Sequence, residues 1–175
     1  LTPGRAALAA LLVACVVYLA ALGNQWALDD HGVIERNPAA HSVGAALRAA
    51  FSPYWPPDAE GYSAGLYRPL VILSYAVDWV MSGARPWWFH LVNIVLHGGA
   101  TALAVLVALS WLPPAGALAA GLVFAVHPVH VEAVANVVGR AELLAAIAVF
   151  GAVLAARRYR QAQAAMERRT WLAVA

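Results

Sequence analysis

Residues 121–144, GLVFAVHPVHVEAVANVVGRAELL, carry ionisable side chains between two apolar segments that suit a lipid bilayer. The run contains two histidines, two glutamates and an arginine. An ionisable group at the centre of a membrane helix costs roughly 2.5–3.5 kcal/mol on insertion scales, so such groups mark a functional site or a water-filled cavity. The fold must therefore keep these side chains away from lipid.

Composition identifies the class of protein. Apolar residues make up 63% of the 175 residues and charged residues 11%, against roughly 45–50% and 25% in soluble domains. The chain is therefore predicted to be a multi-pass membrane protein in contact with lipid. A formal charge of +2, without a basic patch interleaved with aromatic residues, excludes nucleic acid as a partner. Cys15 is the only cysteine, which excludes a disulfide framework and a thiolate metal site.

The basic residues indicate an origin. All eleven are arginine, and the chain is rich in alanine, glycine and valine. This bias is typical of a GC-rich bacterial genome, so the expected location is the bacterial inner (plasma) membrane.

The apolar segments predict an all-α integral membrane fold. Four crossings are expected, at about 6–22, 87–112, 115–131 and 139–156. An outer loop, 23–86, is expected to carry interfacial helices near Val43–Phe51 and Pro69–Ser82, because the second of these is apolar with one polar stripe and too short to cross comfortably. A further span is expected to start at 171, so the chain is interpreted as a fragment of a longer protein.

The arginines test this number of crossings. With four crossings, Arg5 and the group at 157–169 fall on the same inner side, as the positive-inside rule requires. A fifth crossing at Pro69–Ser82 would place five arginines outside. The four-crossing arrangement also places Asp29-Asp30, Tyr67-Arg68 and residues 127–140 on one outer face.

Two positions follow from this topology. Cysteines placed at Ala59 and Ala133 are expected to react with an impermeant thiol reagent from the same side. Charge reversal at Glu60, elsewhere in the loop, is expected to be nearly silent.

Several polar residues could carry chemistry. The adjacent carboxylates Asp29 and Asp30 repel, so one could hold a raised pKa and act as a general base; alternatively they cap a helix or solvate the loop. Arg140 could bind a phosphate by bidentate hydrogen bonds. Its alternatives are a salt bridge to Glu142 or a lipid headgroup, and Arg68 has the same two interpretations.

The segment His127-Pro-Val-His130-Val-Glu132 offers two histidines and a glutamate, which zinc could use. The H-E-x-x-H order is absent, however, and the proline disturbs the spacing. The alternative is that these groups bond one another and nearby backbone carbonyls at a re-entrant turn. No metal site is therefore predicted.

A polar stripe follows helical spacing on the second clear span. It consists of His90, Asn93, His97 and Thr101. Polar residues in a membrane helix point into the bundle, so structural hydrogen bonding between helices is the favoured role.

Four blocks in order carry a family resemblance. They are Leu28-Asp29-Asp30 with Asn37-Pro38, then Tyr67-Arg68-Pro69-Leu70, then PWWFHLVNIVLH at 86–97, and then residues 122–144. Together they resemble the transmembrane and tetratricopeptide-repeat O-mannosyltransferases, relatives of the protein O-mannosyltransferases, over nearly the whole chain.

The resemblance implies a GT-C-type helical bundle and an inverting, metal-independent glycosyltransferase. It implies a polyprenyl-phosphate sugar as donor, mannose being the expected sugar, and a Ser or Thr hydroxyl or a glycan as acceptor, on the periplasmic or outer face. No cofactor is expected. The acidic pair of the family falls on Asp29-Asp30. Its tetratricopeptide repeats would lie beyond residue 175.

Physical chemistry agrees with this assignment, because transfer from a lipid phosphate needs a base for the acceptor hydroxyl and cations for the departing phosphate. Asp29 or Asp30 is the expected base, and Arg140 and Arg68 are the expected phosphate ligands. His127, His130 and Glu132 stand as further candidates. Two rival functions stay open: a non-catalytic membrane scaffold and a zinc-dependent membrane hydrolase.

Overall fold

The computed structural model describes residues 1–56 and 65–174, and every regular element in those ranges is helical. The longer helices are α1 (Pro3–Val17), α3 (Pro69–Ser82), α4 (Pro86–Ala108), α5 (Pro114–Val126) and α7 (Arg140–Val174). Two short helices are α2 (Val43–Arg48) and α6 (Val131–Ala135). The predicted all-α membrane fold is confirmed. Ala59 and Glu60 lie outside the described residues.

Proline begins four of these helices. Pro3, Pro69, Pro86 and Pro114 each stand in a first helical turn, where the missing N–H is not needed and the fixed φ suits the helix. The α3 helix ends at Gly83, whose φ of 62° is left-handed, the conformation that glycine adopts without a Cβ penalty. The four prolines therefore mark where α1, α3, α4 and α5 begin, and Gly83 marks where α3 ends.

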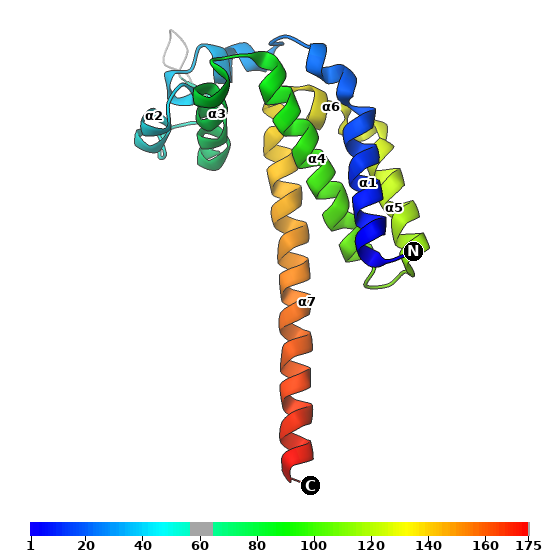
Figure 1. The fold of residues 1–175 in the computed structure, drawn as a ribbon. Helices are drawn as coiled ribbons and strands as arrows, with labels where there is room; N and C mark the ends of the chain where they lie inside the picture. The colour runs from blue at the N-terminus through cyan, green and yellow to red at the C-terminus, as the bar shows by residue number, and fades with distance from the viewer. Residues whose placement is uncertain (57–64, 175) are drawn as a thin grey trace.

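Small residues let the bundle helices approach closely. Helices α1, α4 and α5 pack side by side, and α7 runs along α4 and then extends well beyond the bundle (Figure 1). A Cβ on Gly121 would lie 2.2 Å from Val105 Cγ2, and one on Gly98 would lie 2.7 Å from Cys15 Sγ. Such contacts are how membrane helices associate where lipid removes the hydrophobic driving force.

The predicted crossings correspond to helices with shifted ends. Three helical segments are long and apolar enough to span a membrane: Pro3–Gly23, Pro86–Ala108 and Val137–Ala164. A fourth is possible if Pro114–Val126 and Pro128–Ala135, which meet at 48°, form one broken span. The proline at the break removes a backbone donor, which is the physical cause of the bend.

The last helix is longer than the predicted span. The predicted end of one span at 156 and the predicted start of another at 171 both lie within one continuous helix, α7, which reaches Val174. Residues 157–170 contain arginine, alanine, glutamine, glutamate and methionine but no glycine or proline. These residues favour helix, so nothing in them ends α7.

The first loop folds as a second layer beside the upper end of the bundle, where Figure 1 places α2 and α3. Both predicted loop helices are present, the first of them ending at Arg48 and capped by Ser42, whose Oγ accepts from the Ala45 N–H. Their buried side chains pack with Phe89 of α4 and Val137 before α7. The orientation of α3 in the membrane interface stays a prediction.

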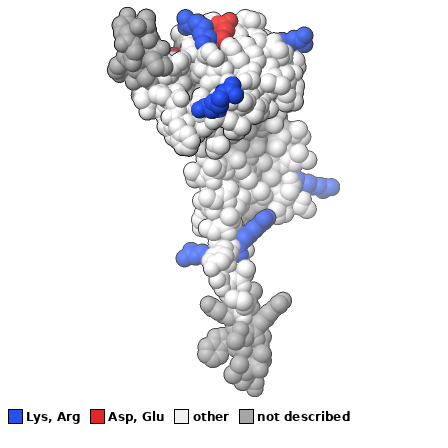
Figure 2. All heavy atoms as spheres, turned by 90° about the vertical axis from the view of Figure 1, so that its left-hand side faces the viewer, with Lys and Arg blue, Asp and Glu red and all other residues white. Residues whose placement is uncertain are grey.

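The arginines gather at the opposite end. Arg157 on α7 hydrogen-bonds Ser110 in the α4–α5 connection, and the start of α1 packs there against Val105 and Ala117. Arg5 and the Arg157 group therefore share one end of the bundle. On the face that carries α2 and α3, a band of uncharged surface separates charged side chains at the upper end from arginines lower down (Figure 2).

Candidate functional site

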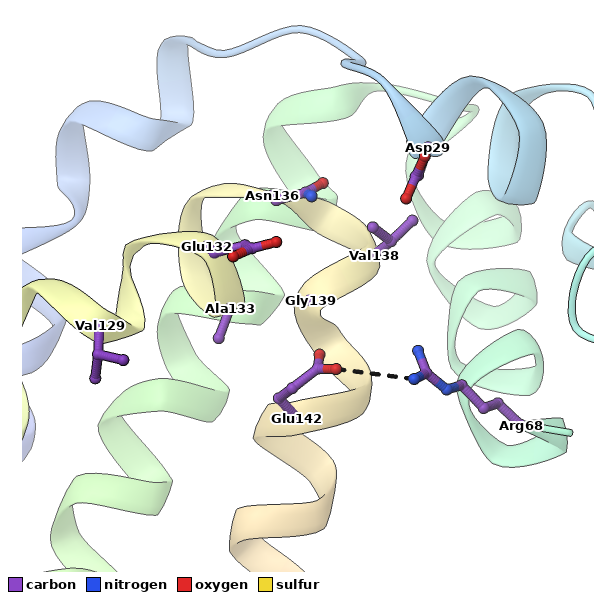
Figure 3. A pocket seen from close by; sticks show the side chains of 9 residues that line it. All are labelled: Asp29, Arg68, Val129, Glu132, Ala133, Asn136, Val138, Gly139 and Glu142. Carbon is purple, nitrogen blue, oxygen red and sulfur yellow. Dashed lines mark ion pairs between the residues drawn. The ribbon is translucent and has the colours of Figure 1, made fainter. Parts of the chain in front are cut away.

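A pocket of about 340 Å³ opens at the upper end of the bundle, where the first loop meets the α6–α7 turn. Its lining side chains come from four segments (Figure 3). They are Asp29, Arg68, Val129, Glu132, Ala133, Asn136, Val138, Gly139 and Glu142. Three carboxylates and one guanidinium thus share a pocket, although they are widely separated in sequence.

The two adjacent aspartates have different surroundings, because Asp29 is exposed and Asp30 is buried. Asp29 is exposed and lines the pocket. Asp30 is fully buried: its Oδ1 accepts the Val138 N–H at 3.1 Å, and its Oδ2 accepts the Ala27 N–H at 3.2 Å. Asp30 therefore ties the first loop to the start of α7 and so holds Asp29 over the pocket.

The backbone before the pair is strained. Leu28 has a φ of 47° and is 84% exposed. A non-glycine residue in this region costs roughly 1–3 kcal/mol and persists only where surrounding structure enforces it. The Asp30 carboxylate accepts the Ala27 and Val138 N–H groups on either side of this turn and so holds the segment in place.

Burial raises the pKa of the Asp30 carboxyl, and its backbone hydrogen bonds from Ala27 and Val138 oppose that rise. The Asp30 side chain is fully buried, so a substrate in the pocket cannot reach its carboxylate. Asp29 is therefore the carboxylate of the pair that a ligand could reach.

Arg68 stands immediately before α3 and faces the pocket from the side opposite α6 (Figure 3). Its Nη2 lies 3.9 Å from Glu142 Oε1, and its guanidinium carbon lies 5.1 Å from the centre of the Tyr54 ring. Both members of the ion pair are partly exposed, so the pair is loose and screened by water. Arg68 is therefore positioned to exchange Glu142 for another anion.

Gly139 shapes the floor of the pocket. A Cβ at this position would lie 2.6 Å from the Ala133 Cα, the Ala133 oxygen and the Glu132 oxygen. All three are backbone atoms, so they cannot rotate away. Glycine is the residue that permits α6 to fold back against the start of α7, and this contact places Glu132 at the rim.

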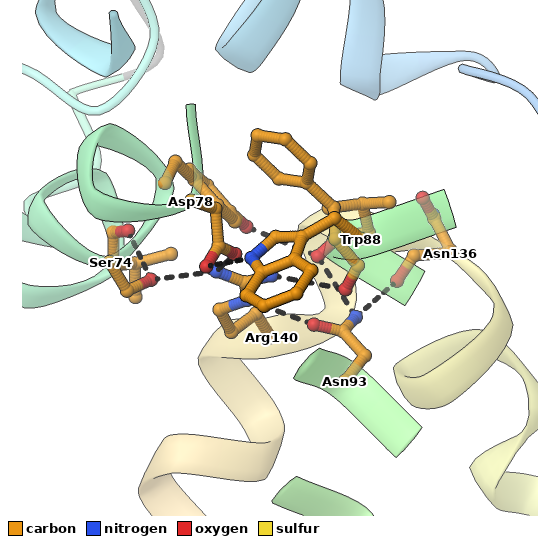
Figure 4. A network of polar contacts seen from close by, with 10 residues as sticks. Ser74, Asp78, Trp88, Asn93, Asn136 and Arg140 are labelled. Atoms are coloured by element: carbon orange, nitrogen blue, oxygen red, sulfur yellow. Dashed lines mark hydrogen bonds and ion pairs between the residues drawn. The ribbon is translucent and has the colours of Figure 1, made fainter. Parts of the chain in front are cut away.

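Arg140 does not line the pocket, which contradicts its predicted role as a phosphate ligand. Its side chain is fully buried, and all three guanidinium nitrogens have protein partners (Figure 4). Nε donates to Asn93 Oδ1 at 2.9 Å, Nη2 donates to the Phe89 oxygen at 3.1 Å, and Nη1 lies 2.5 Å from Asp78 Oδ2. No nitrogen is left for a ligand.

The polar stripe on α3 is the other half of this network. Ser74 accepts a hydrogen bond from Arg140 Nη1 at 3.2 Å, and Asp78 also accepts from Trp88 Nε1 at 3.2 Å. The stripe thus faces a buried arginine. Arg140 joins α3, α4 and α7 behind the pocket.

The predicted inward stripe on α4 is confirmed. His90, Asn93, His97 and Thr101 are all buried. Asn93 Nδ2 donates to the Asn136 and Val137 oxygens, and His97 Nε2 bonds the Ala125 oxygen. These contacts hold the α5–α6–α7 turn against α4.

Of the three remaining candidates, His127, His130 and Glu132, only the glutamate lines the pocket. His127 Nδ1 accepts the Val129 N–H, and His130 packs 4.3 Å from Phe124 between ring centres. Neither histidine lines the pocket, whereas Glu132 does. Among the described residues, no group of three histidine, cysteine or acidic side chains has a geometry for a metal ion.

Sequence reasoning missed two polar side chains of the pocket, Asn136 and Glu142. Glu142 was considered only as a partner for Arg140, and Asn136 was not singled out. Glu142 lies in the first turn of α7, four residues after Val138, and both line the pocket. Helical spacing from the pocket side of that turn was the signal that could have identified it.

Comparison with curated proteins gives related sequences. Protein O-mannosyl-transferase Tmtc2 of Drosophila melanogaster is 42% identical over 166 residues, which cover 93% of this chain and 18% of the relative. Protein O-mannosyl-transferase TMTC1 of Homo sapiens is 35% identical over 163 residues, covering 90% and 18%. Human TMTC4 is 45% identical over 96 residues, covering 46% and 13%. No family model and no solved structure matches the chain.

The relatives bear on origin and extent. These relatives are animal proteins and do not support the predicted bacterial origin. The chain spans about a fifth of the length of the relatives that it matches. Identity of 35–42% across nine-tenths of the chain, on a helical membrane fold, leads to one conclusion. The chain belongs to the transmembrane and tetratricopeptide-repeat O-mannosyltransferase family.

Proposed function

We propose that the pocket transfers mannose from a polyprenyl-phosphate donor to a Ser or Thr hydroxyl of a protein, or to another hydroxyl acceptor, within a GT-C-type membrane domain. One observation carries the proposal: Asp29, an exposed carboxylate, and Arg68, the partly exposed guanidinium, line one pocket at one end of a membrane bundle. The names of the relatives supply the sugar and the class of acceptor.

The reaction is a single displacement. The acceptor oxygen attacks the sugar C1, the bond from C1 to the phosphate oxygen breaks, and polyprenyl phosphate leaves with the electron pair. The hydroxyl proton passes to the Asp29 carboxylate. Attack opposite the leaving group inverts the configuration at C1. A positioned general base contributes a factor of about 10² to 10⁴.

Arg68 stabilises the leaving phosphate. A guanidinium can bind phosphate through two parallel hydrogen bonds, and its charge acts where negative charge develops. Asp29, Glu132 and Glu142 share the pocket and would repel the phosphate from its centre. The phosphate therefore sits at the Arg68 rim, and the acceptor hydroxyl sits near Asp29. Positive charge from Arg68 lets the transfer proceed without a metal ion.

The pocket opens on the outer, non-cytoplasmic face. Arg5 and the Arg157 group lie at the opposite end of the bundle, next to Ser110. Arginines near span ends remain on the cytoplasmic side, so the pocket faces the other compartment.

A transfer assay tests the proposal. Full-length protein in detergent receives radiolabelled polyprenyl-phosphate mannose and an acceptor peptide rich in Ser and Thr. Asp29→Asn keeps size and shape but removes the base, so kcat is expected to fall about 10²-fold or more while donor binding survives. Glu35→Gln is the matched control, because Glu35 is an exposed carboxylate paired with His31 outside the pocket.

Three further results complete this test. Asp30→Asn is expected to lower thermal stability as well as rate, because an amide nitrogen replaces one of two accepting oxygens. Exhaustive chelation is expected to leave the rate of transfer unchanged, and a loss would mean that the transfer needs a metal ion. Full activity in Asp29→Asn and in the Asp29→Asn/Asp30→Asn double variant would reject the catalytic role and favour the scaffold.

A further inference from the structure

A groove with two arginines lies at the opposite end of the bundle, where α7 passes the α4–α5 connection (Figure 1). This arginine groove has a volume of about 580 Å³. Its lining includes Ser110 and Trp111 of the connection and Val153, Ala156, Arg157 and Arg160 of α7. Trp111 is 76% exposed, and Arg160 is also exposed, so the groove is open to the surroundings of the bundle.

The arginine groove changes from apolar to cationic along α7. Its α7 residues recur at helical spacing, so they share one face of the helix. Val153 and Ala156 belong to the apolar run of α7, and Arg157 and Arg160 follow directly after that run. One end of the groove therefore suits hydrocarbon, and the other end carries two guanidinium groups.

Arg157 is oriented by one contact with the connection. Its Nη1 donates to Ser110 Oγ. A guanidinium has five N–H donors, and this contact uses only one of them. The surroundings differ from those of Arg140, whose three nitrogens all have protein partners. Ser110 thus positions Arg157 in the groove and leaves its charge available to a ligand.

The two arginines share one face of α7 without a counter-charge. Among the side chains that the structure describes, no carboxylate forms an ion pair with Arg157 or Arg160. They stand three residues apart on the helix, so their like charges repel each other. An anion bound between them would remove that repulsion and accept charge-assisted hydrogen bonds from both.

We propose that the arginine groove binds an anionic phospholipid of the cytoplasmic leaflet, with its phosphate between Arg157 and Arg160 and one acyl chain along Val153 and Ala156. Arginines near span ends favour the cytoplasmic side, and an exposed tryptophan such as Trp111 suits the membrane–water interface. Anionic lipids such as phosphatidylserine are present in the cytoplasmic leaflet. The inference goes beyond the transfer reaction and does not depend on it.

The chemistry of the groove favours this occupant over two others. Phosphatidylcholine also carries a phosphate, but the two arginines would repel its quaternary ammonium group. A soluble phosphate would gain nothing from the apolar end at Val153 and Ala156. An anionic phospholipid is matched at both ends, because its charge meets the arginines and its acyl chain meets the apolar wall.

Lipid titration of full-length protein in neutral detergent tests the inference, with bound lipid counted by native mass spectrometry at physiological ionic strength. Phosphatidylserine is expected to bind at least about tenfold more tightly than phosphatidylcholine. Arg160→Gln removes one charge-assisted contact from an exposed position, so it is expected to raise the Kd for phosphatidylserine about tenfold. Arg158→Gln is the matched control, because Arg158 is an exposed neighbour outside the groove. It is expected to change the Kd by less than about twofold, because salt screens distant exposed charges.

A second pair of variants tests the position of the acyl chain. Ala156→Phe places a ring in the apolar end of the groove, whereas Ala155→Phe places the same ring on an adjacent exposed position outside it. Ala156→Phe is expected to raise the Kd for phosphatidylserine about fivefold or more. Ala155→Phe is expected to leave the Kd unchanged.

A third measurement uses unaltered protein, so it does not depend on whether the variants fold. Phosphatidylserine with a diazirine in one acyl chain is photolysed on the wild type, and the adducts are mapped by mass spectrometry. Adducts are expected on residues 110–111 and 153–156. Unlabelled phosphatidylserine should suppress them, and soluble glycerophosphoserine should not.

The outcomes that contradict the inference are distinct. Equal Kd values for the two lipids, or equal effects of Arg158→Gln and Arg160→Gln, would mean that the arginines attract anions only as surface charge. Adducts confined to other helices would place the lipid elsewhere. Full suppression by glycerophosphoserine would assign the groove to a soluble anion. Each of these results would overturn the lipid site and leave the transfer proposal standing, because the Asp29 pocket lies at the other end of the bundle.

Discussion

At the scale of single residues, two arginines with the same side chain have opposite surroundings. Arg140 is fully buried among Asp78, Ser74, Asn93 and the Phe89 carbonyl. Arg68 is partly exposed and lies 3.9 Å from one carboxylate. Removing one partner of a buried ion pair leaves an uncompensated charge, whereas an exposed pair contributes little to stability.

This contrast gives a stability prediction. Arg140→Met is expected to lower the free energy of unfolding by about 3–5 kcal/mol, because Asp78 is left buried without its cation. Arg68→Met, the matched control, is expected to change it by less than about 1 kcal/mol. Thermal unfolding in detergent measures both. Adding Asp78→Asn to Arg140→Met should recover part of the loss; no recovery would mean that the ion pair is not the cause.

The sequence could identify Asp29 and Arg68 as candidates, but it could not assign their roles. Which carboxylate of the pair faces a ligand depends on the left-handed backbone at Leu28 and on the contact of Asp30 with Val138, 108 residues away. The partner of Arg140 was equally hidden. Glu142 was the nearby carboxylate in the sequence, and the fold supplied Asp78 instead. Pairings between distant segments are set by packing that local patterns do not encode.

At the scale of elements, the turn from α5 through α6 into α7 builds the pocket. It bends 48° at the break before Pro128, and it carries Glu132, Asn136 and Gly139 into the lining of the pocket. Asn93 and Asp30 fasten it through backbone hydrogen bonds. The apolar runs predicted starts at 6, 87 and 115, and the helices begin at Pro3, Pro86 and Pro114, because proline favours the first helical turn locally. The apolar pattern predicted where the span would end, at 156, but it did not show that the helix itself continues through the arginines to Val174.

Two glycines on this side of the chain give a matched comparison. Gly139→Ala is expected to destabilise the protein by several kcal/mol, since its Cβ would lie 2.6 Å from three backbone atoms. Gly151→Ala, within α7, meets nothing within 4 Å and is expected to stabilise by up to about 1 kcal/mol. Thermal unfolding distinguishes them, and equal melting temperatures for the two variants would contradict the close approach of α6 to α7.

At the scale of the whole molecule, the bundle separates two chemically different ends. Asp29, Arg68, Glu132 and Glu142 gather at one end, and Arg157 with its neighbouring arginines lies at the other. The parity of the crossings and the distribution of arginines were enough to predict this separation. The depth of the pocket was not predictable, because it depends on how α3 packs beside α7.

The central claim is that the first loop, which carries Asp29, and the turn between α5 and α7, which carries Glu132, lie on the same side of the membrane. Thiol labelling tests this claim most directly. In full-length protein with Cys15→Ala, cysteines replace the exposed residues Ser52 and Val129, one from each segment, and Gln161 near the arginines. An impermeant reagent applied to sealed vesicles should label Ser52→Cys and Val129→Cys from the same side and Gln161→Cys only from the other. Labelling of Ser52→Cys and Val129→Cys from opposite sides would place the membrane between Asp29 and Glu132 and contradict a single pocket.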